Sequence, residues 1–108
     1  RLSDVYLIAA EAAVKTGGDA TSYINTLRKN RIEGYTDVAS VTLEDILFER
    51  RIELFAENSM AFDYWRNKMS VKNPNVGEVN YDDYRVILPI PQDEINLAPD
   101  VLIQNPGY

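Results

Sequence analysis

The sequence predicts an all-α fold in which tetratricopeptide-like helical hairpins, residues 1–69, are followed by an extended, proline-spaced C-terminal strap of the same domain, residues 70–108. Three observations predict this architecture. Apolar residues recur at helical spacing through the first part. Glycines and helix-capping residues divide that part into segments, and prolines punctuate the second part. The two hairpins begin about 40 residues apart, somewhat more than the tetratricopeptide period of about 34, and residue identities barely repeat between them.

The first hairpin begins with a helix over residues 1–16 that is apolar on nearly all sides, so we expect it to pack on more than one of them. Gly17 and Gly18 end this helix, because glycine readily adopts the positive φ angles of a helix end. Asp19 is the predicted N-cap of a second helix that reaches about Ile32. Because further helices are expected upstream, one face of the first helix should be bare, and the residues expected there are Leu7, Ile8 and Val14.

The second hairpin begins at Thr42, which with Asp45 nearly matches a capping box, in which two side chains cap a helix start reciprocally. This third helix is predicted to reach Glu57. Residues 58–59 are interpreted as a break, after which a fourth, shorter helix runs to about Lys68. The first four elements are therefore two helical hairpins.

The strap is predicted to contain little regular structure. Residues 73–77 are interpreted as a loop. Residues 85–88 form a short β-like run that ends at Pro89, because proline has no N–H to donate to a strand ladder. Residues 92–97 are expected to form one or two helical turns.

The composition excludes several function classes. A net charge of −6 and a pI near 4.5 argue against nucleic acid or an anionic membrane surface as a partner. The chain has no cysteine and no histidine, which excludes disulfides, thiolate nucleophiles, the usual zinc sites and Ser–His or Cys–His catalysis. No cofactor and no metal are expected. No apolar run is long enough for a transmembrane helix. The chain opens within a predicted helix, without an initiator Met, so we expect it to be a fragment whose targeting signal lies upstream.

The third predicted helix carries carboxylates at a spacing of four residues, which stacks like charges along one stripe and destabilises an isolated helix. The stripe consists of Asp45, Glu49, Glu53 and Glu57. Arg50 and Arg51 lie beside it, so we expect a structural ion network in which at least one of these arginines is partly buried. The alternatives are a glycosidase pair formed by Glu49 and Glu53, and a di-metal carboxylate site, which would require a histidine. The predicted network comprises Glu49, Arg50, Arg51, Glu53, Glu57, Asp63 and Arg66.

Four motifs follow one another along essentially the whole chain. The central one is Ile46-Leu47-x-Glu49-Arg50-Arg51-x-Glu53-Leu54-x-x-Glu57, followed by Phe62-Asp63 and Arg66. The tail motif is Pro89-Ile90-Pro91-Gln92-x-Glu94-Ile95, closing with Gln104-Asn105-Pro106-Gly107-Tyr108. The helical pair before them contains Arg1-Leu2-x-x-x-Tyr6-Leu7-x-x-Ala10-Glu11-Ala12 and Ile24-Asn25-x-x-Arg28-x-x-Arg31. Together these motifs resemble the C-terminal region of the SusD-like (SusD/RagB) nutrient-binding lipoproteins. The chain departs from the family pattern at Asn58, Met60 and Tyr64, which bears on the local charge network and not on the fold.

The resemblance implies an all-helical, tetratricopeptide-like scaffold that is lipid-anchored on the extracellular face of the outer membrane of Bacteroidetes-type bacteria. It implies a non-catalytic protein that binds an oligosaccharide or another nutrient and works with a TonB-dependent outer-membrane transporter. In the family, the glycan platform is expected to come largely from the upstream chain. The resemblance therefore implies that these 108 residues are mainly scaffold.

Three aromatic side chains are candidates for contact with a ligand, namely Tyr64, Trp65 and Tyr81. Each is able to stack on a sugar ring, although such rings more often serve a core or an interface. An alternative function is that of a tetratricopeptide-like adaptor, which would bind a protein or peptide partner in a concave groove. Further regular repeats upstream would favour the adaptor over the nutrient-binding protein.

Overall fold

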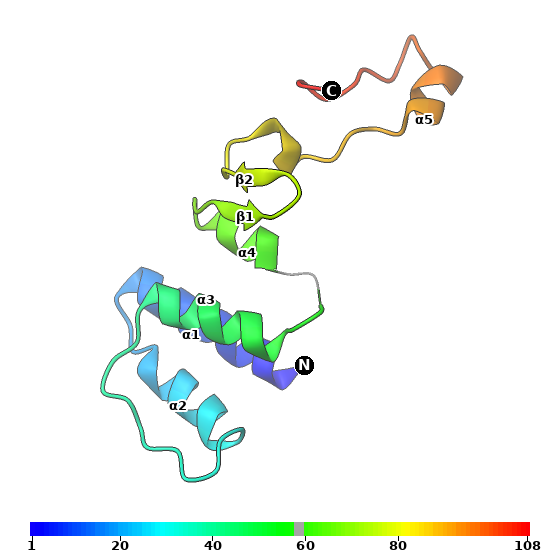
Figure 1. The fold of residues 1–108 in the computed structure, drawn as a ribbon. Helices are drawn as coiled ribbons and strands as arrows, with labels where there is room; N and C mark the ends of the chain where they lie inside the picture. The colour runs from blue at the N-terminus through cyan, green and yellow to red at the C-terminus, as the bar shows by residue number, and fades with distance from the viewer. Residues whose placement is uncertain (58–59) are drawn as a thin grey trace. The chain divides into compact units, whose positions relative to one another are not determined.

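The computed structural model describes residues 1–57 and 60–108. The described chain is mainly helical and has two short strands in addition, which confirms the predicted fold class. It divides into two compact units, Arg1–Met60 and Ala61–Tyr108, each described by itself (Figure 1). No helix in the described ranges is long and apolar enough to cross a membrane.

The first unit consists of three helices, α1 (Leu2–Thr16), α2 (Thr21–Lys29) and α3 (Leu43–Glu53), and α1 packs against both of the others. α1 ends as predicted, because Gly17 adopts the left-handed conformation with φ 76° and its N–H bonds back into the last turn. The antiparallel course of α1 and α2 can be followed in Figure 1. Their pairing into a tetratricopeptide-like array stays a prediction.

α2 is shorter at both ends than predicted. The N-cap position belongs to Ala20, because the Asp19 carboxylate accepts a hydrogen bond at 2.8 Å from the N–H two residues later and so forms a turn outside the helix. At the other end, Asn30 Nδ2 donates to the Thr26 carbonyl at 2.8 Å, and this carbonyl is the one a continuing helix would have used. The N-cap predicted at Asp19 is therefore wrong by one residue, and the helix ends at Lys29, short of the predicted end at about Ile32.

α3 begins with the predicted capping box. Thr42 Oγ1 accepts from the Asp45 N–H at 3.2 Å, and Asp45 Oδ2 accepts from the Thr42 N–H at 2.8 Å, so each residue caps the other. The helix ends at Glu53, short of its predicted end. Arg1 Nη2 donates to the Glu53 carbonyl at 2.7 Å, and Ala56 has a φ of 64°, which a right-handed helix does not accommodate.

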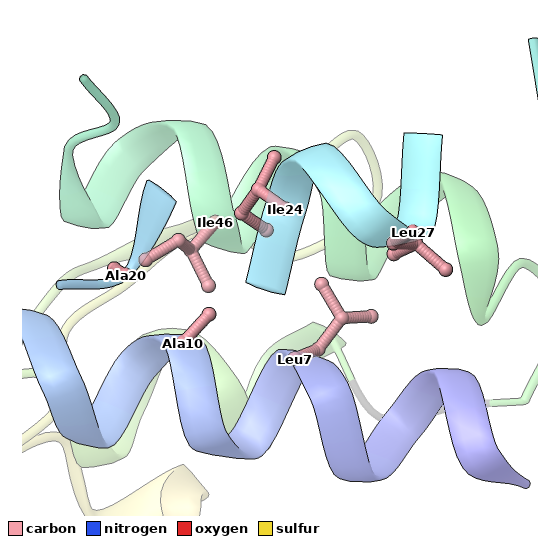
Figure 2. Packing of buried hydrophobic residues seen from close by; sticks show 6 residues of the cluster. All are labelled: Leu7, Ala10, Ala20, Ile24, Leu27 and Ile46. Atoms are coloured by element: carbon pink, nitrogen blue, oxygen red, sulfur yellow. The ribbon is translucent and has the colours of Figure 1, made fainter. Parts of the chain in front are cut away.

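Buried apolar side chains from all three helices, and from the turn before α2, form the core of the first unit. Its members are Leu7, Ala10, Ala20, Ile24, Leu27 and Ile46 (Figure 2). The large side chains Leu7, Ile24 and Ile46 are at most 1% exposed. Full burial of each such side chain contributes about 1.5–3 kcal/mol to stability.

The prediction that α1 has a bare apolar face is only partly correct. Leu7 is fully buried, because it shares a face with Ala10 and meets the side chains of α2 and α3. Val14 is half-buried and packs against the same core. Ile8 is 53% exposed, so of the three residues expected on this face it alone lies largely open.

The second unit contains short elements. They are α4 (Met60–Arg66), the antiparallel strands β1 (Val71–Asn73) and β2 (Gly77–Val79), the 3₁₀ turn η1 (Tyr84–Val86) and α5 (Gln92–Leu97). The helix predicted over residues 92–97 is confirmed, whereas the hairpin of β1 and β2 was expected only as loop. The β-like run predicted over residues 85–88 is wrong. Asp83 Oδ1 accepts from the Arg85 N–H at 2.9 Å and thereby starts a 3₁₀ turn instead. The break predicted at residues 58–59 lies outside the described residues.

Candidate functional site

The carboxylate stripe of α3 meets cations from α2 and from the turn that follows it. Arg28 Nε lies 2.8 Å from Glu49 Oε2. Arg31 binds Glu53 with two nitrogens, Nε to Oε2 at 3.0 Å and Nη2 to Oε1 at 2.7 Å. Arg28 lies on α2 and Arg31 lies two residues beyond its end, whereas Glu49 and Glu53 lie four residues apart on α3. These glutamates are therefore paired by arginines of α2 and of the turn after it, and the sequence had suggested arginines of α3 itself.

The first of these contacts is the more shielded from water. The Arg28 and Glu49 side chains are 19% and 12% exposed. Burial alone would lower the pKa of Arg28, but hydrogen bonds with Tyr35 and Glu49 outweigh this effect and raise the pKa. The Tyr35 hydroxyl also donates to Asn25 Oδ1 at 2.8 Å, which ties the loop after α2 to the same place.

The second contact strongly stabilises the ionised form of Glu53. Its side chain is 12% exposed, whereas that of Arg31 is 52% exposed. The Arg31 hydrogen bonds lower the pKa of Glu53 to about 2, opposed by desolvation and assisted by a hydrogen bond from Ser3 and by the charge of Arg1. A general acid at neutral pH needs a raised pKa, so Glu53 is poorly suited to that role.

Arg50 and Arg51 are neighbours in sequence with opposite surroundings. Arg50 is 6% exposed and its Nη1 lies 2.9 Å from Asp4 Oδ1, which connects α3 with α1. Arg51 is exposed and has no carboxylate partner within the described part of the chain. At the end of the stripe, Glu57 pairs with Arg1 at 2.6 Å, and both side chains are about half exposed.

The remaining two members of the predicted network, Asp63 and Arg66, lie on α4. Arg66 Nη2 donates to Asp63 Oδ1 at 2.8 Å, and the Asp63 side chain is 8% exposed. The Asp63 carbonyl also accepts from Asn67 Nδ2 at 2.8 Å. That the seven residues act together as one structural network stays a prediction.

The described residues contain no group of three or more His, Cys, Asp or Glu side chains that could hold a metal ion. Glu49 and Glu53, the pair considered for glycoside hydrolysis, are both bound by arginines. A hydrolase needs one carboxyl group kept protonated near the scissile bond, and the lowered pKa of Glu53 works against that role.

The aromatic candidates differ in exposure. Trp65 is half-buried, its Nε1 donates to the Val79 carbonyl at 3.3 Å, and its ring meets Phe62 edge-on with centroids 6.0 Å apart. The hydrogen bond joins α4 to β2, whereas the ring contact lies within α4. Tyr64 is also half-buried, whereas Tyr81 is 44% exposed. Tyr81 is thus the most accessible of the three, and contact of any of them with a ligand stays a prediction.

The structure adds partners that the sequence analysis had not assigned to the network, namely Arg1, Asp4, Arg28 and Arg31. The sequence analysis had named Arg28 and Arg31 only as part of a motif. Their spacing of three residues, set against glutamates spaced by four on another helix, is the signal that could have identified them.

Comparison with known proteins gives one family. The sequence pattern of the SusD family matches residues 1–108. The starch-binding protein SusD of Bacteroides thetaiotaomicron is 34% identical over 120 residues, covering 100% of this chain and 21% of that protein. The SusD-like protein P2 of Formosa agariphila is 34% identical over 126 residues, covering 100% and 25%. The chain therefore spans a quarter or less of the length of these curated relatives.

Solved structures agree. A SusD superfamily protein from Bacteroides thetaiotaomicron superposes with a TM-score of 0.84 at 36% identity, covering 98% of this chain and 27% of that one. A SusD superfamily protein from Bacteroides vulgatus gives a TM-score of 0.77 at 38% identity, covering 100% and 27%.

Proposed function

The chain belongs to the SusD family, and we propose that it is the C-terminal, mainly scaffold part of a non-catalytic glycan- or nutrient-binding component of an outer-membrane uptake system. The whole-chain match to the family carries the proposal. In the intact protein, an oligosaccharide or another nutrient would be the ligand and a TonB-dependent transporter the partner. A lipid anchor upstream would hold the protein at the extracellular face of the outer membrane.

The scaffold role is supported by apolar faces that the described structure leaves open. On α1, Leu2, Val5 and Ile8 are 71%, 58% and 53% exposed. These residues recur every three positions and so lie on one side of the helix. Exposed apolar surface of this kind marks a contact site.

α3 and the turn after it have a similar open apolar surface. Phe48 and Ile52 lie four residues apart on α3, Phe55 follows the end of the helix, and the three are 56%, 57% and 82% exposed. Because the chain spans a quarter or less of its curated relatives, we propose that the remainder of a full-length chain covers both faces.

The absence of catalysis is supported by the state of the carboxylates. Glu49 and Glu53 are each bound by an arginine, and the pKa of Glu53 is lowered. Incubation with a panel of plant, host and microbial glycans should release no reducing sugar. Hydrolysis that disappears in Glu49→Gln or Glu53→Gln would contradict the proposal.

The scaffold assignment is tested on the 108-residue chain and on a full-length parent protein. The short chain should self-associate or bind a hydrophobic dye and should show no measurable affinity for oligosaccharides in titration calorimetry, whereas the parent should show the reverse. Phe48→Ser with Phe55→Ser should lower dye binding, and Tyr81→Ser, in the second unit, serves as the control. A short chain that is monomeric, dye-silent and sugar-binding would place the ligand site here and refute the assignment.

A further inference from the structure

The last part of the second unit, residues 87–108, is ordered without a hydrophobic core of its own. No residue in this fully described stretch is buried. Its large apolar side chains point to solvent, with Leu97 81%, Val101 78% and Ile103 85% exposed. Burial of apolar surface, the usual source of stability, therefore does not explain why this stretch holds one conformation.

A single side chain closes the stretch into a loop. Gln104 Oε1 accepts from the Ile90 N–H at 2.9 Å, and Gln104 Nε2 donates to the Ile90 carbonyl at 2.9 Å. These are the two hydrogen bonds that a residue exchanges with its partner in an antiparallel ladder, and here a carboxamide makes both. The same oxygen also accepts from the Asn105 N–H at 2.9 Å, which fixes the orientation of the carboxamide.

Two further contacts continue the closure in antiparallel order. Asn105 Nδ2 donates to the Leu88 carbonyl at 2.7 Å, and the Tyr108 hydroxyl donates to the Ile87 carbonyl at 3.0 Å. The Tyr108 ring meets Tyr84 edge-on, with centroids 5.1 Å apart. The side chains at the C-terminal end thus serve as a second strand for residues 87–90, which follow η1.

We propose that Gln104 is the latch of a preformed lobe, residues 90–104, whose apolar side chains Leu97, Val101 and Ile103 dock on the remainder of a full-length SusD-family chain. The lobe includes α5 (Figure 1), and the Gln104 side chain joins its two ends. The inference rests on the proposed function, because it takes the rest of the family protein as the occupant.

Two observations favour that occupant. The chain spans a quarter or less of its curated relatives, so most of the surface of a full-length protein lies outside it. The N–H and carbonyl of Ile90 and the carbonyl of Leu88 are hydrogen-bonded within the closure. Covering a backbone segment with apolar protein surface costs less free energy when its polar groups are already hydrogen-bonded. A latched lobe also loses less conformational entropy on docking than an open tail does.

Hydrogen exchange on the 108-residue chain tests the latch without any ligand or partner. Gln104→Met preserves the length of the side chain and removes both bonds, so exchange of the Ile90 amide should accelerate roughly tenfold. The matched control is Gln92→Met, because Gln92 bonds only the exposed Asn96 side chain, at 2.9 Å. Unchanged exchange at Leu7 and Ile24 establishes that the first unit remains folded.

Equal protection of Ile90 in the parent and in Gln104→Met would overturn the latch while leaving the proposed function intact. The docking step is read from the same peptides in a full-length parent protein. There the amides of α5 should exchange more slowly than in the short chain, and Ile103→Asp should abolish the difference. Equal exchange of α5 in the short and full-length chains would overturn the docking step.

Discussion

Arg50→Ala and Arg51→Ala change neighbouring residues of one helix, and the structure predicts different outcomes for them. Arg50 is 6% exposed and pairs with Asp4 across the contact between α3 and α1. Arg51 is exposed and has no carboxylate partner among the residues the structure describes. The two substitutions remove the same atoms from adjacent positions, so their difference isolates the effect of burial and pairing.

The size of the effect follows from the surroundings of each arginine. Removing one partner of a fully buried ion pair costs about 3–5 kcal/mol. The Asp4 side chain is 37% exposed, so water recovers part of the lost interaction, and we expect a cost of about 2–3 kcal/mol for Arg50→Ala. Arg51→Ala should cost about 0–0.5 kcal/mol, as surface substitutions usually do.

Urea unfolding followed by circular dichroism measures both free energies, and a thermal melt should show Arg50→Ala lower by about 10 °C or more. Lys68→Ala, another exposed cation, serves as a second reference. Asp4→Asn should reproduce part of the loss, because it removes the charge from the other side of the pair. If Arg50→Ala and Arg51→Ala unfold within about 0.5 kcal/mol of each other, the buried-pair reasoning is wrong.

Three further predictions concern single residues. Because the pKa of Glu53 is about 2 in the folded chain against an ordinary value of 4.5, its stabilisation is complete above pH 4.5 and is lost as the pH falls toward 2. Glu53→Gln should therefore flatten the acid dependence of stability by about 1–2 kcal/mol, measured by urea unfolding at about pH 6 and about pH 3. Gly107→Ala should destabilise the C-terminal tail by about 1–3 kcal/mol, because Gly107 has φ 97° and a Cβ there would lie 2.5 Å from the Tyr84 ring. Amide hydrogen exchange in the tail should become faster, and unchanged exchange would contradict the prediction. Ile24→Ala should cost about 2–5 kcal/mol through the cavity it leaves, whereas Ile52→Ala, at a position 57% exposed, should cost under about 1 kcal/mol, and equal costs in urea unfolding would contradict the assigned core.

Two helix boundaries with local chemical causes, the start of α3 and the end of α1, were predicted from the sequence. The capping box of Thr42 and Asp45 depends on two side chains three residues apart, and the stop at Gly17 depends on one residue's freedom to adopt positive φ. The end of α3 was not predictable, because it involves a hydrogen bond from Arg1 that only the folded chain brings into place. The 3₁₀ turn at Arg85 was missed although its cause is local, because Asp83, two residues earlier, accepts hydrogen bonds from the Arg85 backbone and side chain.

The ion pairs of α3 show why the sequence motif identified the charged residues but not all of their partners. Residues one and two positions after Glu49 project about 100° and 200° away from it around a helix, so Arg50 and Arg51 do not face Glu49. In the structure Glu49 pairs with Arg28 of α2, and Glu53 pairs with Arg31 in the turn after α2. Arg50 instead points toward α1 and pairs with Asp4.

The same geometry separates the two apolar sides of α1. A helix that is hydrophobic nearly all round must be covered on more than one side, but periodicity cannot say which neighbour covers which side. In the structure, Leu7 and Ala10 face α2 and α3, the two helices of the first unit that pack against α1. Val5 and Ile8 lie on the other side and remain more than half exposed. The open side carries the same apolar character as the covered one, and this is the physical reason to expect a further helix against it in a complete SusD-family protein.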